Sequence, residues 1–159
     1  MTDFNILSPS HIFFTISCIA IIIYLPRIFV DKTSSSKKTL IFIIISLILV
    51  NQGMDLYREG YMQEWKLGLP LHLCDFSSAS IIIYLLTQRR EFFLFAFFAG
   101  ISGAGMAILT PDVLYNFPHI DYVRHMIGHS MILLGVTYAM IIDNQRPELK
   151  DVHRVLFVL

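Results

Sequence analysis

The sequence predicts an all-α integral membrane protein, a polytopic helix bundle that forms one transmembrane domain over residues 1–159. Composition is the first observation behind this prediction: 55% of the residues are hydrophobic and 15% are charged, whereas soluble domains are about 45–50% apolar and about 25% charged. The mean hydropathy of +0.65 is the second. The third is a series of apolar runs that approach the roughly 20 residues a helix needs to cross a bilayer.

The apolar runs define five full spans. Their approximate bounds are 12–30, 39–57, 71–87, 92–109 and 122–142. β-Branched residues crowd several of these runs, but the runs are too long for strands, and a helix in lipid satisfies all its backbone polar groups internally. A further apolar run, 155–159, reads as the start of a sixth span, so we expect the chain to be truncated there.

Charge and cysteine content exclude several function classes. Twelve basic residues balance twelve acidic ones, which argues against nucleic acid as a partner. Two cysteines cannot form the disulfide framework of a small secreted domain. We expect membrane lipids as partners and no cofactor. The sequence leaves open whether the chain forms a homo-oligomer, although small residues such as Gly100 and Ala104 would allow close helix packing.

Basic residues predict the orientation of the spans. Nine fall on one side of the membrane, in the connections after the first, third and fifth spans: Arg27, Lys32, Lys37, Lys38, Arg89, Arg90, Arg146, Lys150 and Arg154. Three fall on the other side: Arg58, Lys66 and Arg124. Because basic residues concentrate in cytoplasmic connections, we predict a multi-pass protein of the cell membrane with an extracytoplasmic N-terminus.

Polar residues gather near the predicted extracytoplasmic ends of four spans. Ionisable groups at membrane depth are costly and usually mark function. We predict a functional site there, with catalytic residues His72, Cys74, Asp75 and His129. The predicted substrate-binding residues are Asn51, Asp55, Thr110, Asp112 and His125.

Three kinds of chemistry fit this set. Cys74 lies in the first turn of a predicted helix, where free N–H groups favour a thiolate, and a histidine of the fifth span could act as its base. His125 and His129, one helical turn apart, could instead bind zinc together with His72 or Asp75. Alternatively, the cluster could hold a small ligand in a non-enzymatic binding or transport protein.

Two motifs carry a family resemblance over residues 51–142. The segments Leu69-Pro70-Leu71-His72-Leu73-Cys74-Asp75 and Gly105-Met106-Ala107-Ile108-Leu109-Thr110-Pro111-Asp112, with Phe117-Pro118 and His129, resemble the bacterial YwaF-like integral membrane proteins. More distantly, they resemble the eukaryotic transmembrane protein 164 family. The resemblance implies a bundle of six or seven helices.

The eukaryotic branch implies phospholipid acyl transfer through a cysteine acyl intermediate with a histidine partner. Its cysteine lies between the Pro and the His of the first motif, where this sequence has Leu71; Cys74 is offset from that position, whereas His72 and His129 match. We therefore expect a membrane lipid acyltransferase or acyl hydrolase, with the zinc-dependent hydrolase and the small-ligand binding or transport protein as alternatives.

Overall fold

A computed structural model describes residues 3–57 and 72–156, and these residues form six helices. The helices are α1 (Pro9–Phe29), α2 (Ser34–Asp55), α3 (Leu73–Thr87), α4 (Arg90–Leu109), α5 (Ile120–Ile141) and α6 (Asp151–Leu156). The predicted positions of Arg58, Lys66 and Leu71 lie outside the described residues.

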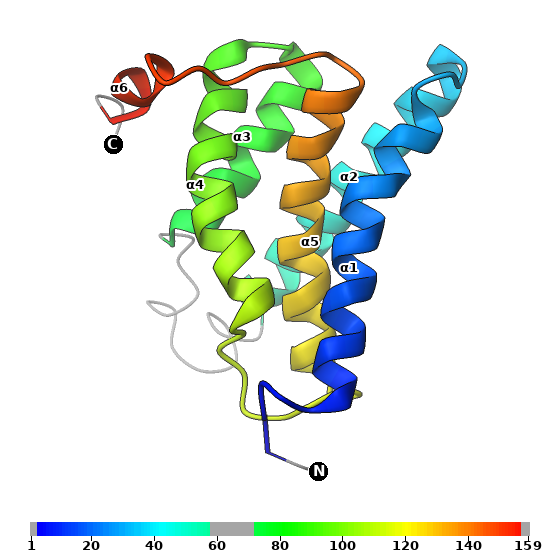
Figure 1. The fold of residues 1–159 in the computed structure, drawn as a ribbon, viewed down its shortest axis with the longest axis vertical. Helices are drawn as coiled ribbons and strands as arrows, with labels where there is room; N and C mark the ends of the chain where they lie inside the picture. Colours follow the sequence, from blue (N-terminus) through cyan, green and yellow to red (C-terminus); the bar gives the residue numbers. More distant parts are fainter. Residues whose placement is uncertain (1–2, 58–71, 157–159) are drawn as a thin grey trace.

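The five long helices run side by side in alternating directions, and α5 lies among the other four (Figure 1). Close helix contact requires glycine at Gly135 in α5, among other positions: a Cβ atom there would lie 2.5 Å from the Ile81 side chain of α3. We call the end where α1, α3 and α5 begin, and where α2 and α4 end, the lower end of the bundle (Figure 1).

Polar caps extend the helices beyond the apolar runs. The side chains of Ser8, Thr33 and His119 accept the backbone N–H groups of His11, Ser36 and Asp121, respectively. Each cap satisfies a donor that the first helical turn would otherwise leave open. For this reason α1, α2 and α5 begin at Pro9, Ser34 and Ile120, before the predicted starts of the spans.

The structure supports three membrane spans among its described residues rather than the predicted five and the start of a sixth. α1, α2 and α4 are long and apolar enough to cross a bilayer. α3 is apolar but has 15 residues, about 22 Å of helix against a hydrocarbon core of about 30 Å. α5 has 22 residues, but its first half carries polar residues such as Asp121, Arg124 and His125.

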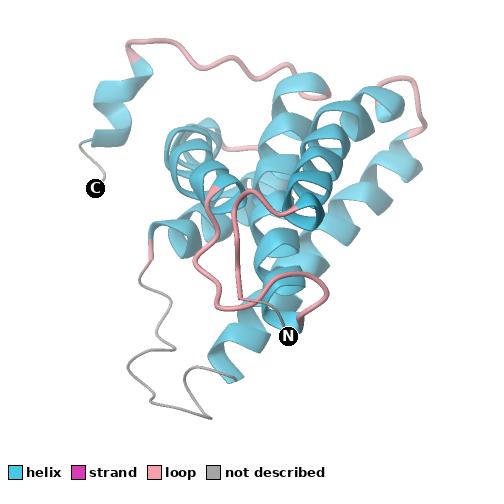
Figure 2. Cartoon of the chain, turned by 60° about the horizontal axis from the view of Figure 1, so that its bottom comes forward, coloured by secondary structure: helices cyan, strands magenta, loops and turns pink. Residues whose placement is uncertain are grey.

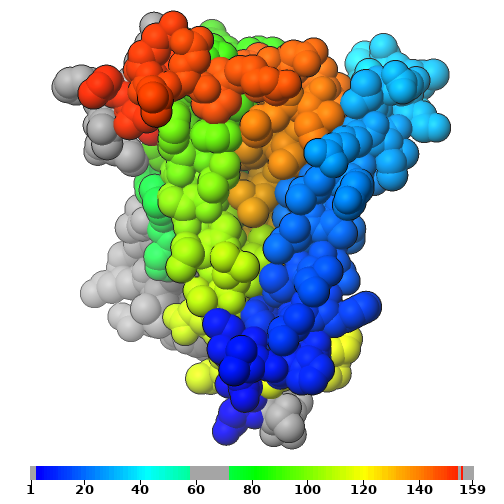
Figure 3. Space-filling view, viewed as in Figure 1, coloured from blue at the N-terminus to red at the C-terminus, as the bar shows by residue number. Residues whose placement is uncertain are grey.

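The region of the expected sixth span forms α6 as far as Leu156, a helix of six residues. It lies at the upper end of the bundle, next to α4 (Figure 3). Arg90 holds it there, because its Nη2 atom lies 2.8 Å from Oδ2 of the buried Asp151 and also donates to the Arg146 carbonyl. Residues 157–159 lie outside the described part of the chain.

The N-terminal segment binds the loop between α4 and α5 at the lower end (Figure 2). Asn116 is the main contact: its side chain donates to the Asp3 carbonyl at 2.8 Å and accepts from the Ser8 hydroxyl at 3.2 Å. The Phe4 amide donates to the Leu114 carbonyl at 2.9 Å. These bonds hold the loop as one wall of the site described next.

Candidate functional site

A pocket of about 550 Å³ opens at the lower end of the bundle. Its walls come from the end of α2, the beginning of α3, the α4–α5 loop and the first half of α5. Eight of the nine predicted site residues line it: Asn51, Asp55, His72, Cys74, Asp75, Asp112, His125 and His129. Side chains from sequence positions far apart therefore meet in one polar cavity, of the size that holds small ligands.

Thr110 is the predicted site residue that does not line the pocket. It ends α4, its side chain is exposed, and its hydroxyl donates to the Met106 carbonyl at 2.9 Å. The Met106 carbonyl also accepts the Thr110 backbone N–H at 2.7 Å, so the hydroxyl adds a second hydrogen bond at the end of the helix, which is a structural role.

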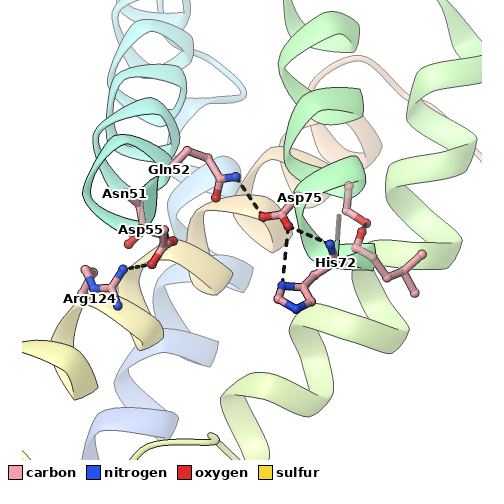
Figure 4. A network of polar contacts seen from close by, with 8 residues as sticks. Asn51, Gln52, Asp55, His72, Asp75 and Arg124 are labelled. Carbon is pink, nitrogen blue, oxygen red and sulfur yellow. Dashed lines mark hydrogen bonds and ion pairs between the residues drawn. The ribbon is translucent and has the colours of Figure 1, made fainter. Parts of the chain in front are cut away.

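The end of α2 faces the beginning of α5 through two contacts one helical turn apart. Asp55 forms an ion pair with Arg124 (Figure 4). One turn further into the bundle, Asn51 lies so close to Gly128 that a Cβ atom there would be 2.5 Å from Asn51 Nδ2. Asn51 also donates to Asp55 at 3.1 Å. The two helices are therefore matched at consecutive turns along one wall of the pocket.

Asp75 joins α2 to the beginning of α3 (Figure 4). Its Oδ1 atom accepts from Gln52 Nε2 at 2.9 Å, and its Oδ2 atom accepts the His72 backbone N–H at 2.9 Å. The same Oδ2 atom lies 3.7 Å from His72 Nδ1, although the His72 side chain is 74% exposed. Asp75 thus caps α3 and faces the exposed side chain of His72, which also lines the pocket.

The two histidines of α5 have one ring nitrogen each committed to a backbone carbonyl. His129 Nδ1 lies 2.8 Å from the His125 carbonyl, and His125 Nε2 lies 3.2 Å from the Ala107 carbonyl. A carbonyl only accepts hydrogen bonds, so both of these nitrogens carry a proton. In a neutral ring the other nitrogen, Nε2 of His129 and Nδ1 of His125, then holds a lone pair. The ring centroids are 4.3 Å apart.

Cys74 is a half-buried free thiol in the first turn of α3. Free N–H groups at this helix start favour a thiolate. The neighbouring carboxylate of Asp75 opposes a second negative charge. The thiol therefore depends on a nearby base to lose its proton during a reaction.

The described residues contain no group of three His, Cys, Asp or Glu side chains arranged to hold a metal ion. The zinc alternative requires three protein ligands around one point. His125, His129, His72 and Asp75 share a pocket but do not form such a group.

Sequence reasoning missed two polar residues that shape the site, Arg124 and Gln52. In the sequence, Arg124 counts only as one of the three basic residues on its side of the membrane. Gln52 carries no charge and therefore gave no signal in a search for ionisable groups. Helical spacing offered a clue, because Gln52 precedes Asp55 by three positions and so shares a helix face with it.

The fold and the pocket define a class: an α-helical membrane protein with a polar cavity at one end of its bundle. Within that class, residues 6–159 match the family model described as the TMEM164 family. The chain therefore belongs to the TMEM164 family. Neither the search of curated proteins nor the search of solved structures gave a match.

Proposed function

We propose that this protein transfers or hydrolyses an acyl group of a membrane lipid in the lower-end pocket. The observation that carries the proposal is the hydrogen bond from His129 Nδ1 to the His125 carbonyl. It fixes the tautomer in which Nε2 of His129 is a base, inside a pocket that also contains the Cys74 thiol. A nucleophile and a base that share a cavity are the minimum requirement for covalent acyl transfer.

In this mechanism His129 Nε2 takes the thiol proton while Sγ of Cys74 attacks the carbonyl carbon of the lipid ester. The tetrahedral intermediate breaks its C–O bond, and the leaving alkoxide takes the proton from Nε2. The acyl group is then a thioester on Cys74. Water, or the hydroxyl of a second lipid, next gives its proton to Nε2 and attacks the thioester, and Cys74 leaves with that proton.

The remaining polar residues are assigned to binding. His72 and Asp75 line the pocket, the first exposed and the second largely shielded, and we expect them to contact the polar part of the lipid. Asn51, Asp55, Asp112 and His125 also line the pocket. All these roles are proposals that site-directed variants can test one at a time.

We also propose where the pocket lies relative to the membrane. Basic residues predict that the lower end is extracytoplasmic, which puts the pocket at the outer leaflet of the cell membrane. α3 and α5 run beside α1, α2 and α4 within one bundle. We therefore propose that they cross the membrane with these three helices, protected from lipid by their neighbours.

A binding or transport protein is the second candidate, and the paired side chains of the pocket favour it. Asp55 is paired with Arg124, and Asp75 is bonded to Gln52. Such fixed polar groups can recognise a ligand without reacting with it. The two candidates differ in whether a covalent bond of the lipid is broken.

The test uses the full chain purified into phospholipid nanodiscs, with lysophospholipid and acylated products measured by mass spectrometry. His129→Gln should reduce the rate by about 10²–10⁴-fold, and Cys74→Ala should abolish acyl transfer. His153→Gln, an exposed histidine of α6 at the opposite end, is the control. Full activity in His129→Gln would contradict the proposal, whereas no lipid turnover by the wild-type protein would favour the binding role.

A further inference from the structure

A lipid substrate needs a route into the pocket that does not remove its chains from the bilayer. Exposing each CH₂ group of an acyl chain to water costs free energy. The exposed side chains of His72 and Leu114 line the pocket at the lower end, where the candidate spans α2 and α4 end, so we expect this opening of the pocket to face away from the hydrocarbon core. This opening suits water or a polar headgroup. The acyl chain of the lipid would therefore have to enter the pocket from the side of the bundle.

Two flanks of the pocket are closed by tight contacts. Between α2 and α5, Asn51 lies against Gly128 with no room for a methyl group. Where α3, α4 and α5 meet, a Cβ atom on Gly100 would lie 3.2 Å from Ile132 and 3.8 Å from Ser77. An acyl chain could pass at these places only if packed helices separated.

The flank between α2 and α3 is held by a polar contact and not by close packing. It is bridged by the hydrogen bond from Gln52 to Asp75 (Figure 4). From Leu49 to Asp55, where α2 ends, no residue is buried, and the next two residues, Leu56 and Tyr57, are exposed. Among the described residues, opening this flank therefore breaks a polar contact between α2 and α3 and separates no buried apolar side chain in this part of α2.

Apolar side chains lie beside this bridge. Leu56 lines the pocket and is 57% exposed, and Phe76, the residue after Asp75, is 48% exposed. Gln52 lies within the last turn of α2, a candidate span, so its depth is near the boundary between acyl chains and headgroups. The ester bonds of a phospholipid lie at this boundary.

We propose that a bilayer lipid enters the pocket sideways between α2 and α3, with the Gln52–Asp75 hydrogen bond as the contact that must open. This proposal rests on the proposed function, because it assumes a lipid substrate, and it adds the route by which that substrate arrives. The acyl chain stays against the apolar surface of Leu56 and Phe76, while the ester reaches the cavity.

The test measures how fast Cys74 is alkylated by two maleimides in the full chain held in nanodiscs. N-hexadecylmaleimide is confined to the bilayer, whereas N-ethylmaleimide also reaches the pocket from water, and both carry the same reactive group. A Cys18→Ala background removes the second thiol. Because the readout is alkylation and not turnover, it can fail or succeed independently of the proposed acyl chemistry.

Gln52→Ala should speed alkylation by N-hexadecylmaleimide roughly tenfold, since it removes a hydrogen bond to a charged group. Gln52→Trp should slow the same reaction by a similar factor by filling the route. N-ethylmaleimide should react at an unchanged rate in both variants. Met54→Ala and Met54→Trp are the matched controls, because Met54 lies on the same helix turn, is 36% exposed and does not line the pocket.

Equal effects on both reagents would show that Gln52 acts on Cys74 itself, and this would overturn the route. If both Gln52 variants leave the rate of alkylation by N-hexadecylmaleimide unchanged, the proposed route is also overturned. That result would favour access through the opening at the lower end. If Gln52→Trp does not fold, the comparison of Gln52→Ala with Met54→Ala decides alone.

Discussion

Asp55 and Arg124 form an ion pair that joins the last turn of α2 to the first turns of α5 across the wall of the pocket. Both side chains are partly shielded from solvent: Arg124 is 13% exposed and Asp55 is 34% exposed. From the sequence, Asp55 is predicted to bind substrate and Arg124 counts only as a basic residue on the same side of the membrane, so the sequence does not predict this pair. The pair sets the position of α2 relative to the two histidines of α5.

Loss of Arg124 should therefore destabilise the bundle. Arg124→Ala leaves Asp55 partly buried without its partner, and we expect the free energy of unfolding to fall by about 1.5–3 kcal/mol. Thermal unfolding in detergent measures the change. Lys150→Ala is the control, because Lys150 pairs with Glu148 on an exposed surface where ion pairs contribute little. Equal melting temperatures for Arg124→Ala and the wild type would show that the pair does not stabilise the fold.

The contact between Asn51 and Gly128 predicts a steric effect. Gly128→Ala inserts a methyl group at a position 2.5 Å from Asn51 Nδ2, and we expect a loss of about 1–3 kcal/mol through overpacking. Gly105→Ala in α4 meets no atom within 4 Å and should be neutral or slightly stabilising. Adding Asn51→Ala to Gly128→Ala should recover part of the loss. Additive losses in the double variant would mean that the two residues do not clash.

Asp143, at the upper end of the bundle, should make the stability of the fold depend on pH. Asp143, just beyond α5, accepts a hydrogen bond from the Tyr84 hydroxyl at 3.0 Å, and burial raises the pKa of its carboxyl. A raised pKa in the folded state means that the folded protein holds the proton more tightly. This contribution to stability is present below the unfolded pKa of about 3.9 and is lost as the pH rises through the folded value.

Asp143→Asn should remove this dependence, because a neutral amide can still accept from Tyr84 and does not ionise. The variant should match the wild type in acid and exceed it in melting temperature near neutral pH. Melting curves recorded across that range measure the difference. Parallel pH profiles for the two proteins would show that ionisation of Asp143 does not affect folding.

The orientation is testable by labelling intact cells with an impermeant thiol reagent. Cysteines at Ser35 and Gln88, in the connections rich in basic residues, should be protected. A cysteine at Leu114, which is 79% exposed at the lower end, should react. The opposite pattern would place the pocket on the cytoplasmic side.

Hydropathy predicted the five long helices well, because apolar runs of sufficient length have few other structures available in lipid. It located their ends less well, since caps such as Ser8, Thr33 and His119 add polar turns that hydropathy windows leave out. It also overestimated the spans: α3 begins only at Leu73 among the described residues, and polar residues interrupt the apolar character of α5.

The sequence could predict that four side chains lie in one pocket, because their shared depth follows from the topology. These are His72, Cys74, Asp75 and His129. The contacts that the pocket residues make with one another could not be predicted. The partner of Asp55 depends on how α2 and α5 align, and Gly128 sets that alignment through a contact between distant positions. The distinction between Thr110 and its neighbour Asp112 likewise depends on the backbone at the end of α4.

Intact-protein mass spectrometry can detect directly whether a lipid acyl group is carried on Cys74. The full chain in nanodiscs is quenched with acid during turnover, and its mass is compared with those of the Cys74→Ala and His129→Gln variants. We expect an adduct of one acyl group on the wild-type protein that maps to Cys74, is removed by hydroxylamine, and is absent from both variants. Turnover of the lipid with no adduct, or an adduct that persists in Cys74→Ala, would show that the acyl group is not carried on Cys74.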